Sequence, residues 1–203
     1  MTEKLESRYT QLCGEMSDIY EHLPTLKRYT EECDTICEMG VRWVVSTFAF
    51  MAGLPKKLTS IDIQSPNEWQ RGMEDYILAE QCAKENNIDF KFIQANTLEV
   101  EIDKVDLLFI DTWHAYKQLS AELALHHSKV NKYIVLHDTT HFEFIDEKSY
   151  EMWGSDWMGD GPGLWLAVTE FLDKHPEWKI KERFTNNNGL TILERVNDDT
   201  TRI

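Results

Sequence analysis

Short apolar runs that each end in a polar side chain recur five times along the chain. The runs occupy residues 35–37, 58–61, 90–93, 107–110 and 133–136. The last two are almost continuously hydrophobic, which is typical of strands covered on both faces of a sheet. Amphipathic stretches separate the runs, and a chain that alternates strand and helix forms a mainly parallel sheet with helices on both faces. The sequence therefore predicts an α/β fold.

Three stretches between or after these runs carry helix signals. A helix is expected to start at Ser65, which offers a cap and is followed by a proline and by the capping-box residue Glu68. Trp69 is expected on its apolar face. A second helix is expected from about Ala115 and a third over residues 164–172.

The two ends of the chain differ from this alternating middle. Residues 1–32 begin with an amphipathic pattern and are expected to form a helical cap segment, followed by a single domain over residues 33–203. Near the other end, two alternating segments, 178–184 and 190–194, flank an Asn/Gly turn. They predict an antiparallel hairpin that closes one edge of the sheet.

Composition and charge exclude several classes of function. The chain of 203 residues carries 21 Lys and Arg against 36 Asp and Glu, a net charge of −15. A surface this negative repels phosphate backbones, so no nucleic-acid substrate is expected. No apolar run approaches the roughly 20 residues that cross a bilayer, and no signal peptide is evident. We expect a cytoplasmic protein without membrane association, whose four cysteines are reduced.

The polar residues at the strand ends are the main functional signal. In open parallel sheets, ligands bind in the crevice beyond the carboxyl ends of the strands. The five runs deliver Glu38, Asp62, Asn96, Asp111 and the pair 137–138 to this edge. Strand ends are often polar simply because they meet solvent, but five in succession favour a ligand site.

Several sequence segments together carry a family resemblance. They are residues 38–40, 46–47, 60–63, 109–116, 135–139, 164–168 and 187–193. Their order and spacing resemble those of class I S-adenosylmethionine-dependent methyltransferases, in particular the O-methyltransferases of cephalosporin biosynthesis and macrolide-sugar modification. The resemblance covers residues 33–195. It implies a Rossmann-like methyltransferase fold, S-adenosylmethionine as cofactor, and O-methylation of a small hydroxylated, sugar-like acceptor.

The resemblance also implies a cofactor-binding role for six residues. Glu38 and Gly40 lie where the family passes the methionine part of the cofactor, and Ser46 lies near the helix start that faces its carboxylate. Asp62 matches the acid that binds the ribose hydroxyls, and Asn96 matches a position beside the adenine. Asp111, the sixth, ends the fourth run. The chain departs from the family pattern after Gly40, where further glycines are usual and this sequence has none before residue 53.

Methyl transfer to oxygen requires that the hydroxyl lose its proton, and two residues are placed to assist. His114 lies one turn after Asp111 if the helix starts at the strand end, so that both side chains point into the crevice. Because histidine titrates near neutral pH, His114 is the candidate general base, with Asp111 beside it in the catalytic site. Structural alternatives remain open: Asp111 as a helix cap and His114 as a packed histidine.

A metal site is a further expectation. Asp111 and Asp138 end neighbouring strands, so the two carboxylates are expected to share a divalent metal such as Mg²⁺, with His137 as third ligand. A histidine ligand moves the preference from magnesium toward manganese, iron or zinc. Family relatives that use a metal often carry Glu-Asp where this chain has His137-Asp138, which leaves metal dependence open.

Residues 142–163 form a long connection, which we interpret as a substrate lid with glycine hinges. Its aromatic residues Tyr150, Trp153 and Trp157 are expected to form flat walls for a sugar ring. The segment around His22 is expected to fold over the site.

Two other hypotheses remain. One is a metal-dependent hydrolase or oxygenase that uses the Asp111, His114, His137 and Asp138 cluster. The other is a catalytically silent cofactor-binding module. The expected partner is a small-molecule substrate, and a homo-oligomeric state is left open.

Overall fold

A seven-stranded, mainly parallel sheet organises the chain. The computed structural model describes residues 1–68, 72–148 and 159–196. The strands are β1 (Thr35–Met39), β2 (Lys57–Asp62), β3 (Asp89–Gln94), β4 (Val105–Ile110), β5 (Val130–His137), β6 (Trp178–Phe184) and β7 (Leu190–Arg195). Their order in the sheet is β3-β2-β1-β4-β5-β7-β6. The first five run parallel, and β7 is antiparallel to both β5 and β6. The predicted α/β fold and the hairpin are confirmed.

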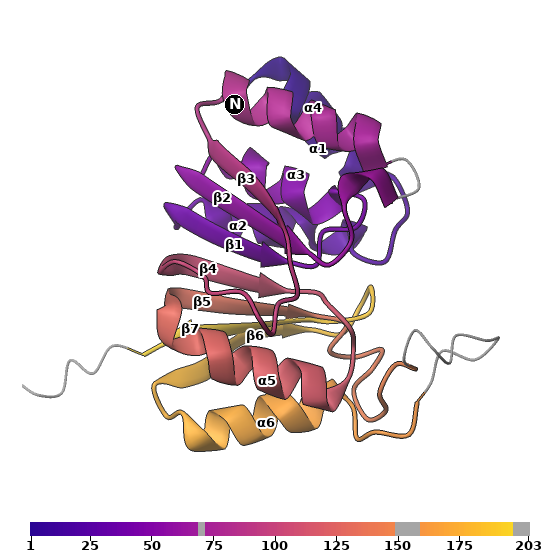
Figure 1. Cartoon of the computed structure of the whole chain (residues 1–203), viewed down its shortest axis with the longest axis vertical. Helices are drawn as coiled ribbons and strands as arrows, with labels where there is room; N and C mark the ends of the chain where they lie inside the picture. The colour runs from indigo at the N-terminus through magenta and orange to yellow at the C-terminus, as the bar shows by residue number, and fades with distance from the viewer. Residues whose placement is uncertain (69–71, 149–158, 197–203) are drawn as a thin grey trace, which may run out of the picture.

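Helices cover both faces of the sheet (Figure 1). They are α1 (Glu3–Gly14), α2 (Leu23–Thr30), α3 (Val45–Ala52), α4 (Gly72–Glu85), α5 (Tyr116–His126) and α6 (Leu164–Lys174). Short 3₁₀ turns are η1 (Tyr20–His22), η2 (Pro66–Glu68) and η3 (His127–Lys129). None of the helices in the described residues is long and apolar enough to cross a bilayer.

Two hydrophobic cores follow from the alternation of side chains along each strand. Phe109 of β4 points to the face of α1–α4, where its ring meets Phe50 of α3 at 5.3 Å between centroids. The neighbouring Leu108 points to the opposite face and packs in the core of α5 and α6 with Leu119 and Val168. Central strands are therefore buried on both sides, as their continuous hydrophobicity indicates.

The N-terminal segment shares a core with the sheet. Leu5 of α1 and Leu23 and Leu26 of α2 are fully buried in the same cluster as Phe109. The first helix is shorter than the amphipathic pattern suggests, because the chain leaves helical conformation after Gly14.

The predicted helix after β2 begins later than expected. Residues Pro66–Glu68 form a 3₁₀ turn, and the described part of α4 begins at Gly72. The capping interaction nevertheless forms, because the backbone N–H of Ser65 donates to the Glu68 carboxylate at 2.7 Å. Trp69 lies outside the described residues.

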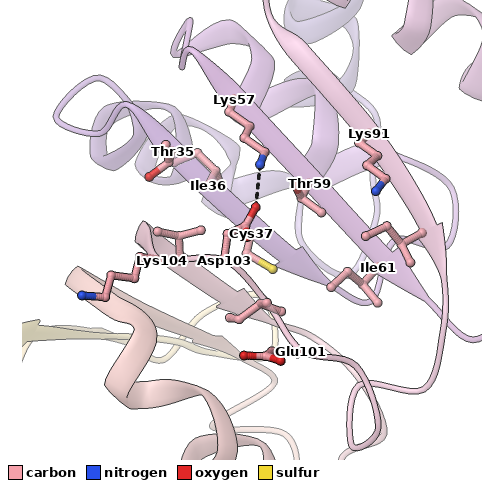
Figure 2. Close-up of a pocket in the computed structure, with 13 residues that line it drawn as sticks. Thr35, Ile36, Cys37, Lys57, Thr59, Ile61, Lys91, Glu101, Asp103 and Lys104 are labelled. Carbon is pink, nitrogen blue, oxygen red and sulfur yellow. Dashed lines mark hydrogen bonds and ion pairs between the residues drawn. The ribbon is translucent and has the colours of Figure 1, made fainter.

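The connection from β3 to β4 carries no helix, and the sheet face beside it is partly open. Residues 95–104 contain only a turn. A cavity of about 180 Å³ lies here, over β1, β2 and β3. Figure 2 shows Lys57 reaching toward Asp103, with 2.7 Å between nitrogen and carboxylate. Cys37, Ile61 and Ile102 line the interior. This cavity lies apart from the strand-end residues singled out by the sequence.

A substitution at Gly189 tests how closely the turn between β6 and β7 packs against the residues after β5. Its φ is +95°, and a Cβ there would lie 2.3 Å from the Thr140 hydroxyl oxygen. We expect Gly189→Ala to lower the free energy of unfolding by about 1–3 kcal/mol, because strain and a clash act together. Urea denaturation measures the change.

The matched control is Gly14→Ala. Nothing lies within 4 Å of the added methyl group at this helical glycine. Stability is expected to stay the same or rise by at most about 1 kcal/mol. An equal loss of unfolding free energy in both variants would contradict the close packing of the turn at Gly189.

Candidate active site at the carboxyl edge of the sheet

Four titratable side chains meet where β4 and β5 end. Asp111 follows β4, His137 ends β5, and His114 and Asp138 follow within a few residues. Nε2 of His114 lies 2.9 Å from Oδ2 of Asp138 and 3.2 Å from Oδ1 of Asp111. Nδ1 of His137 lies 3.0 Å from Asp138 and 3.3 Å from Asp111. We call these four residues the strand-end cluster. The structure thus brings the predicted catalytic and metal-binding residues together.

The four side chains of the strand-end cluster change one another's pKa values. Burial alone would lower the pKa of His114 and His137, but the two aspartates outweigh it and raise the pKa of both imidazoles well above the usual range. Burial acts against the charged aspartates as well, yet the two imidazoles hold the pKa of Asp138 well below and that of Asp111 below the ordinary value. The cluster therefore stabilises positive charge between two carboxylates.

The ring of His114 is fixed from two sides. Its Nδ1 donates to Oε2 of Glu147 at 2.8 Å, and the backbone N–H of Glu147 donates to the carbonyl of His114 at 2.8 Å. Phe142 stacks on the imidazole with 4.8 Å between centroids and 4° between planes. Nε2 is consequently the nitrogen directed at the two aspartates. Glu147 was missed by sequence reasoning, because nothing in a long acidic connection distinguishes one glutamate from another.

Asp146 ties the two described ends of the predicted lid together. Its Oδ1 accepts the backbone N–H of Tyr116 and of Gly163, both at 2.9 Å. Its own N–H donates to the carbonyl of Gly161 at 3.2 Å. The lid base is thus attached to the start of α5 and of α6. Three aromatic residues expected to line the acceptor site lie outside the described residues: Tyr150, Trp153 and Trp157.

Donor atoms suited to a cation converge in the strand-end cluster. One ligand atom each from Asp111, His114 and Asp138 lies within 4.8 Å of the others. Oδ1 of Asp138 is buried without a hydrogen-bond partner. Asp138 also has a left-handed backbone with φ of +58°. An unpartnered carboxylate oxygen in a strained turn is the kind of feature that a metal ligand shows.

The loop after β1, residues 40–44, passes very close to the strand-end cluster. Gly40 has φ of +84°, and a Cβ there would lie 1.8 Å from the carbonyl oxygen of Asp111. Glycine is therefore required, even though the sequence lacks the usual further glycines. Arg42 and Val44 take left-handed conformations with φ of 47° and 55°. This strain is supported by hydrogen bonds to Asp62.

Asp62 accepts hydrogen bonds from that loop. Its Oδ2 accepts the backbone N–H of Val41 at 2.8 Å and of Arg42 at 3.0 Å, and its Oδ1 accepts that of Gln64 at 2.9 Å. A carboxylate has about four acceptor positions, so room for a further donor remains. The predicted ribose contact of Asp62 stays a prediction.

Glu38 and Ser46 lie deeper than the sequence suggested. The Glu38 side chain is fully buried beneath α3 and accepts hydroxyl donors from Ser46 at 2.6 Å, Thr47 at 2.8 Å and Ser60 at 2.5 Å. Burial raises the pKa of Glu38 to about 7 although the three hydroxyls oppose it. Both side chains are thus engaged with one another, and their contact with a cofactor remains a prediction.

Asn96 and His22 lie at the margins of the site. The amide oxygen of Asn96 accepts the N–H of Leu98 at 3.0 Å and so closes a turn after β3. His22 is buried, with its ring centroid 5.8 Å from that of His137. Its Nε2 donates to the carbonyl of Asn186 at 3.0 Å. The N-terminal segment therefore lies beside the strand-end cluster.

A second buried carboxylate supports the loop after β4. Glu122 of α5 accepts hydrogen bonds from Thr97 at 2.6 Å, Thr112 at 2.9 Å and Gln118 at 2.8 Å. Burial raises its pKa. Thr112 directly follows Asp111, so this network holds the backbone on which the strand-end cluster is built. No sequence pattern pointed to Glu122.

Comparison with known proteins identifies the family. The model of the rhamnosyl O-methyltransferase/CmcI family matches residues 13–196. The chain belongs to this family. The prediction of an S-adenosylmethionine-dependent methyltransferase is thereby confirmed. None of the curated proteins matches the chain.

Solved structures share the fold at low sequence identity. An O-methyltransferase from Bacillus cereus in complex with SAH is 11% identical, with 96% of this chain and 91% of that chain covered and a TM-score of 0.57. The SAH-bound methyltransferase PaMTH1 of Podospora anserina is 12% identical, with 97% and 89% covered and a TM-score of 0.58. TomG of Streptomyces achromogenes, in complex with SAM, is 13% identical, with 97% and 91% covered and a TM-score of 0.55.

The buried Glu38 makes a testable prediction about stability and pH. Its pKa rises from 4.5 toward about 7 on folding, so the folded state binds the proton more tightly than the unfolded state. Stability should therefore decrease as pH rises from about 4.5 to 7, by an amount on the order of 3 kcal/mol from this group alone.

Glu38→Gln removes the titration. Chemical denaturation at several pH values should show that the variant loses this part of the decline. Glu3→Gln, at an exposed residue of α1, is the matched control and should retain it. Parallel pH profiles for wild type and Glu38→Gln would contradict the prediction.

Proposed function

We propose that the chain transfers the methyl group of S-adenosylmethionine to a hydroxyl group of a small, sugar-like acceptor, with His114 as general base. The observation that carries the proposal is the strand-end cluster beside the loop after β1. Gly40 of that loop packs against the backbone of Asp111, so a cofactor held along the loop would lie beside Asp111, whose Oδ1 is 3.2 Å from Nε2 of His114. The family to which the chain belongs supports the reaction class.

In this proposal, the loop after β1 and Asp62 hold the cofactor. Gly40 allows close approach of the backbone, and Asp62 has an acceptor position left for a ribose hydroxyl. Asp62 also sets the path of the loop through the N–H groups of Val41 and Arg42. The roles of Glu38, Ser46 and Asn96 in cofactor binding belong to this proposal too.

The proton follows a short route. As the hydroxyl oxygen forms its bond to the methyl carbon, the carbon–sulfur bond breaks, its electron pair remains on sulfur, and the hydroxyl proton passes to Nε2 of His114. Asp111 and Asp138 stabilise the resulting imidazolium at 3.2 and 2.9 Å. Glu147 fixes the ring through Nδ1. Because the aspartates raise the pKa of His114, the imidazole acts as a base only after it has lost its proton, and the sulfonium charge of a bound cofactor opposes the aspartates and favours that loss.

The strand-end cluster also fits a divalent metal. Asp111 and Asp138 supply oxygen ligands, and the unpartnered Oδ1 of Asp138 is available. We assign the third ligand to His137, whose Nδ1 lies 3.0 Å from Asp138 and 3.3 Å from Asp111, which leaves the more exposed His114 to act as the base. The metal would act as a Lewis acid that lowers the pKa of the acceptor hydroxyl. Two carboxylates with one imidazole suit Mn²⁺ better than Mg²⁺.

Asp62→Ala and His114→Ala should separate binding from catalysis. We expect Asp62→Ala to weaken S-adenosylhomocysteine binding at least about tenfold, because a ribose acceptor and the loop support are lost together. His114→Ala should bind normally but turn over about 10²–10⁴-fold more slowly. Isothermal titration calorimetry and S-adenosylhomocysteine release with a panel of rhamnosyl glycosides and other polyols measure the two effects.

The controls are two substitutions at exposed residues, Asp173→Ala on α6 and His141→Ala after β5. Both should leave affinity and rate near the wild-type values. Unchanged cofactor affinity in Asp62→Ala would contradict the proposed orientation of the cofactor. Full activity in His114→Ala would show that His114 is not the general base.

Metal dependence has its own test. We expect Mn²⁺ to raise the melting temperature of the protein, and His137→Ala to abolish that rise because a ligand is lost. His114→Ala should keep it. Stabilisation by metal with no effect of S-adenosylmethionine would favour the hydrolase or oxygenase hypothesis instead.

A further inference from the structure

A second group of metal-ligating side chains lies at the opposite edge of the sheet. His127 in η3 precedes β5, whereas the strand-end cluster follows it, so the strand separates the two groups by about 25 Å. His175 and Glu177 come from the connection between α6 and β6. Nδ1 of His175 lies 3.3 Å and Nδ1 of His127 lies 3.9 Å from Oε1 of Glu177.

We propose that His127, His175 and Glu177 bind a divalent transition metal, with zinc as the best fit. One donor atom from each residue lies within 4.8 Å of the others. Two imidazoles and one carboxylate form a recognised zinc ligand set, in which water takes the fourth position. Hard cations such as Mg²⁺ and Ca²⁺ prefer oxygen ligands, so they are disfavoured here.

An unpartnered polar atom points to the same site. Nδ1 of His127 is buried and has no hydrogen-bond partner. Buried polar atoms are nearly always satisfied, so an imidazole nitrogen that faces a carboxylate at 3.9 Å without bonding to it calls for a ligand between them.

The three side chains are held in place before any metal binds. Phe171 of α6 packs on both imidazoles, with ring centroids 5.4 Å from His127 and 4.7 Å from His175. The carbonyl of Glu177 accepts the N–H of Val196 at 2.7 Å, just after β7. A metal here would link the start of β5 to the C-terminal hairpin.

One nearby charge opposes the metal. The Arg195 guanidinium lies close enough to lower the pKa of His127. Its Nε and Nη2 donate to the carbonyls of Val130 and His127 at 2.9 and 2.8 Å, which directs its hydrogen bonds at the backbone. Glu177 supplies the compensating negative charge. Affinity should therefore fall steeply when Glu177 is neutralised.

The test must remove the strand-end cluster, which also binds metals in the proposal above. In the full chain with His137→Ala and Asp138→Asn, which removes two of the three ligands assigned to the strand-end cluster, we expect one equivalent of Co²⁺ to bind with the visible absorption of low-coordinate cobalt, and Zn²⁺ to displace it. Adding His175→Ala, or separately Glu177→Gln, should weaken binding by about 100-fold or more, because a direct ligand is lost.

His141→Ala in the same background is the matched control and should bind as the background does. Circular dichroism checks that each variant is folded, and Glu177→Gln retains the side-chain volume if His175→Ala is unstable. A background protein that binds no Co²⁺, or unchanged Co²⁺ affinity in both ligand variants, would overturn the site. Neither outcome bears on methyl transfer, because the same two strand-end residues are replaced in every variant compared.

Discussion

The site depends on the ion pairs that two imidazoles make with two carboxylates, one of them buried and the other partly buried. Asp111 and Asp138 end adjacent strands, and neither is stable as an isolated buried charge. His114 and His137 compensate them at distances of 2.9 to 3.3 Å. Most other polar contacts nearby orient these four groups. Glu147 and Phe142 hold one imidazole, and the turn that carries Asn187 receives the other at 3.3 Å.

Buried acids recur around this centre and stabilise it in a different way. Glu38 and Glu122 are surrounded by hydroxyl and amide donors. Burial raises the pKa of both. Such networks rigidify the backbone beneath a site when every member is satisfied. The Glu38 network connects β1 and β2 to α3, and the Glu122 network connects the loop after β4 to α5.

Part of this site could be predicted from sequence because parallel strands end at one edge. Asp62, Asp111 and Asp138 follow apolar runs, and their placement at the same edge of the sheet follows from strand polarity alone. Glu147 could not be predicted, because its contact with His114 depends on how a long connection returns to the sheet. The partners of Ser46 were also hidden: its hydroxyl turns inward to Glu38, a contact that alternation along β1 permits but does not require.

The sequence by itself determined the alternation of strands and helices, the C-terminal hairpin and the edge at which polar groups collect, because periodicity and strand direction are local properties. Only the tertiary structure decided which nitrogen of His114 faces the aspartates, how Asp62 supports a loop poor in glycine, and that His127 meets His175 and Glu177. Those arrangements depend on distances between segments far apart in the chain. Such distances are set by the packing of the two cores, which no local pattern encodes.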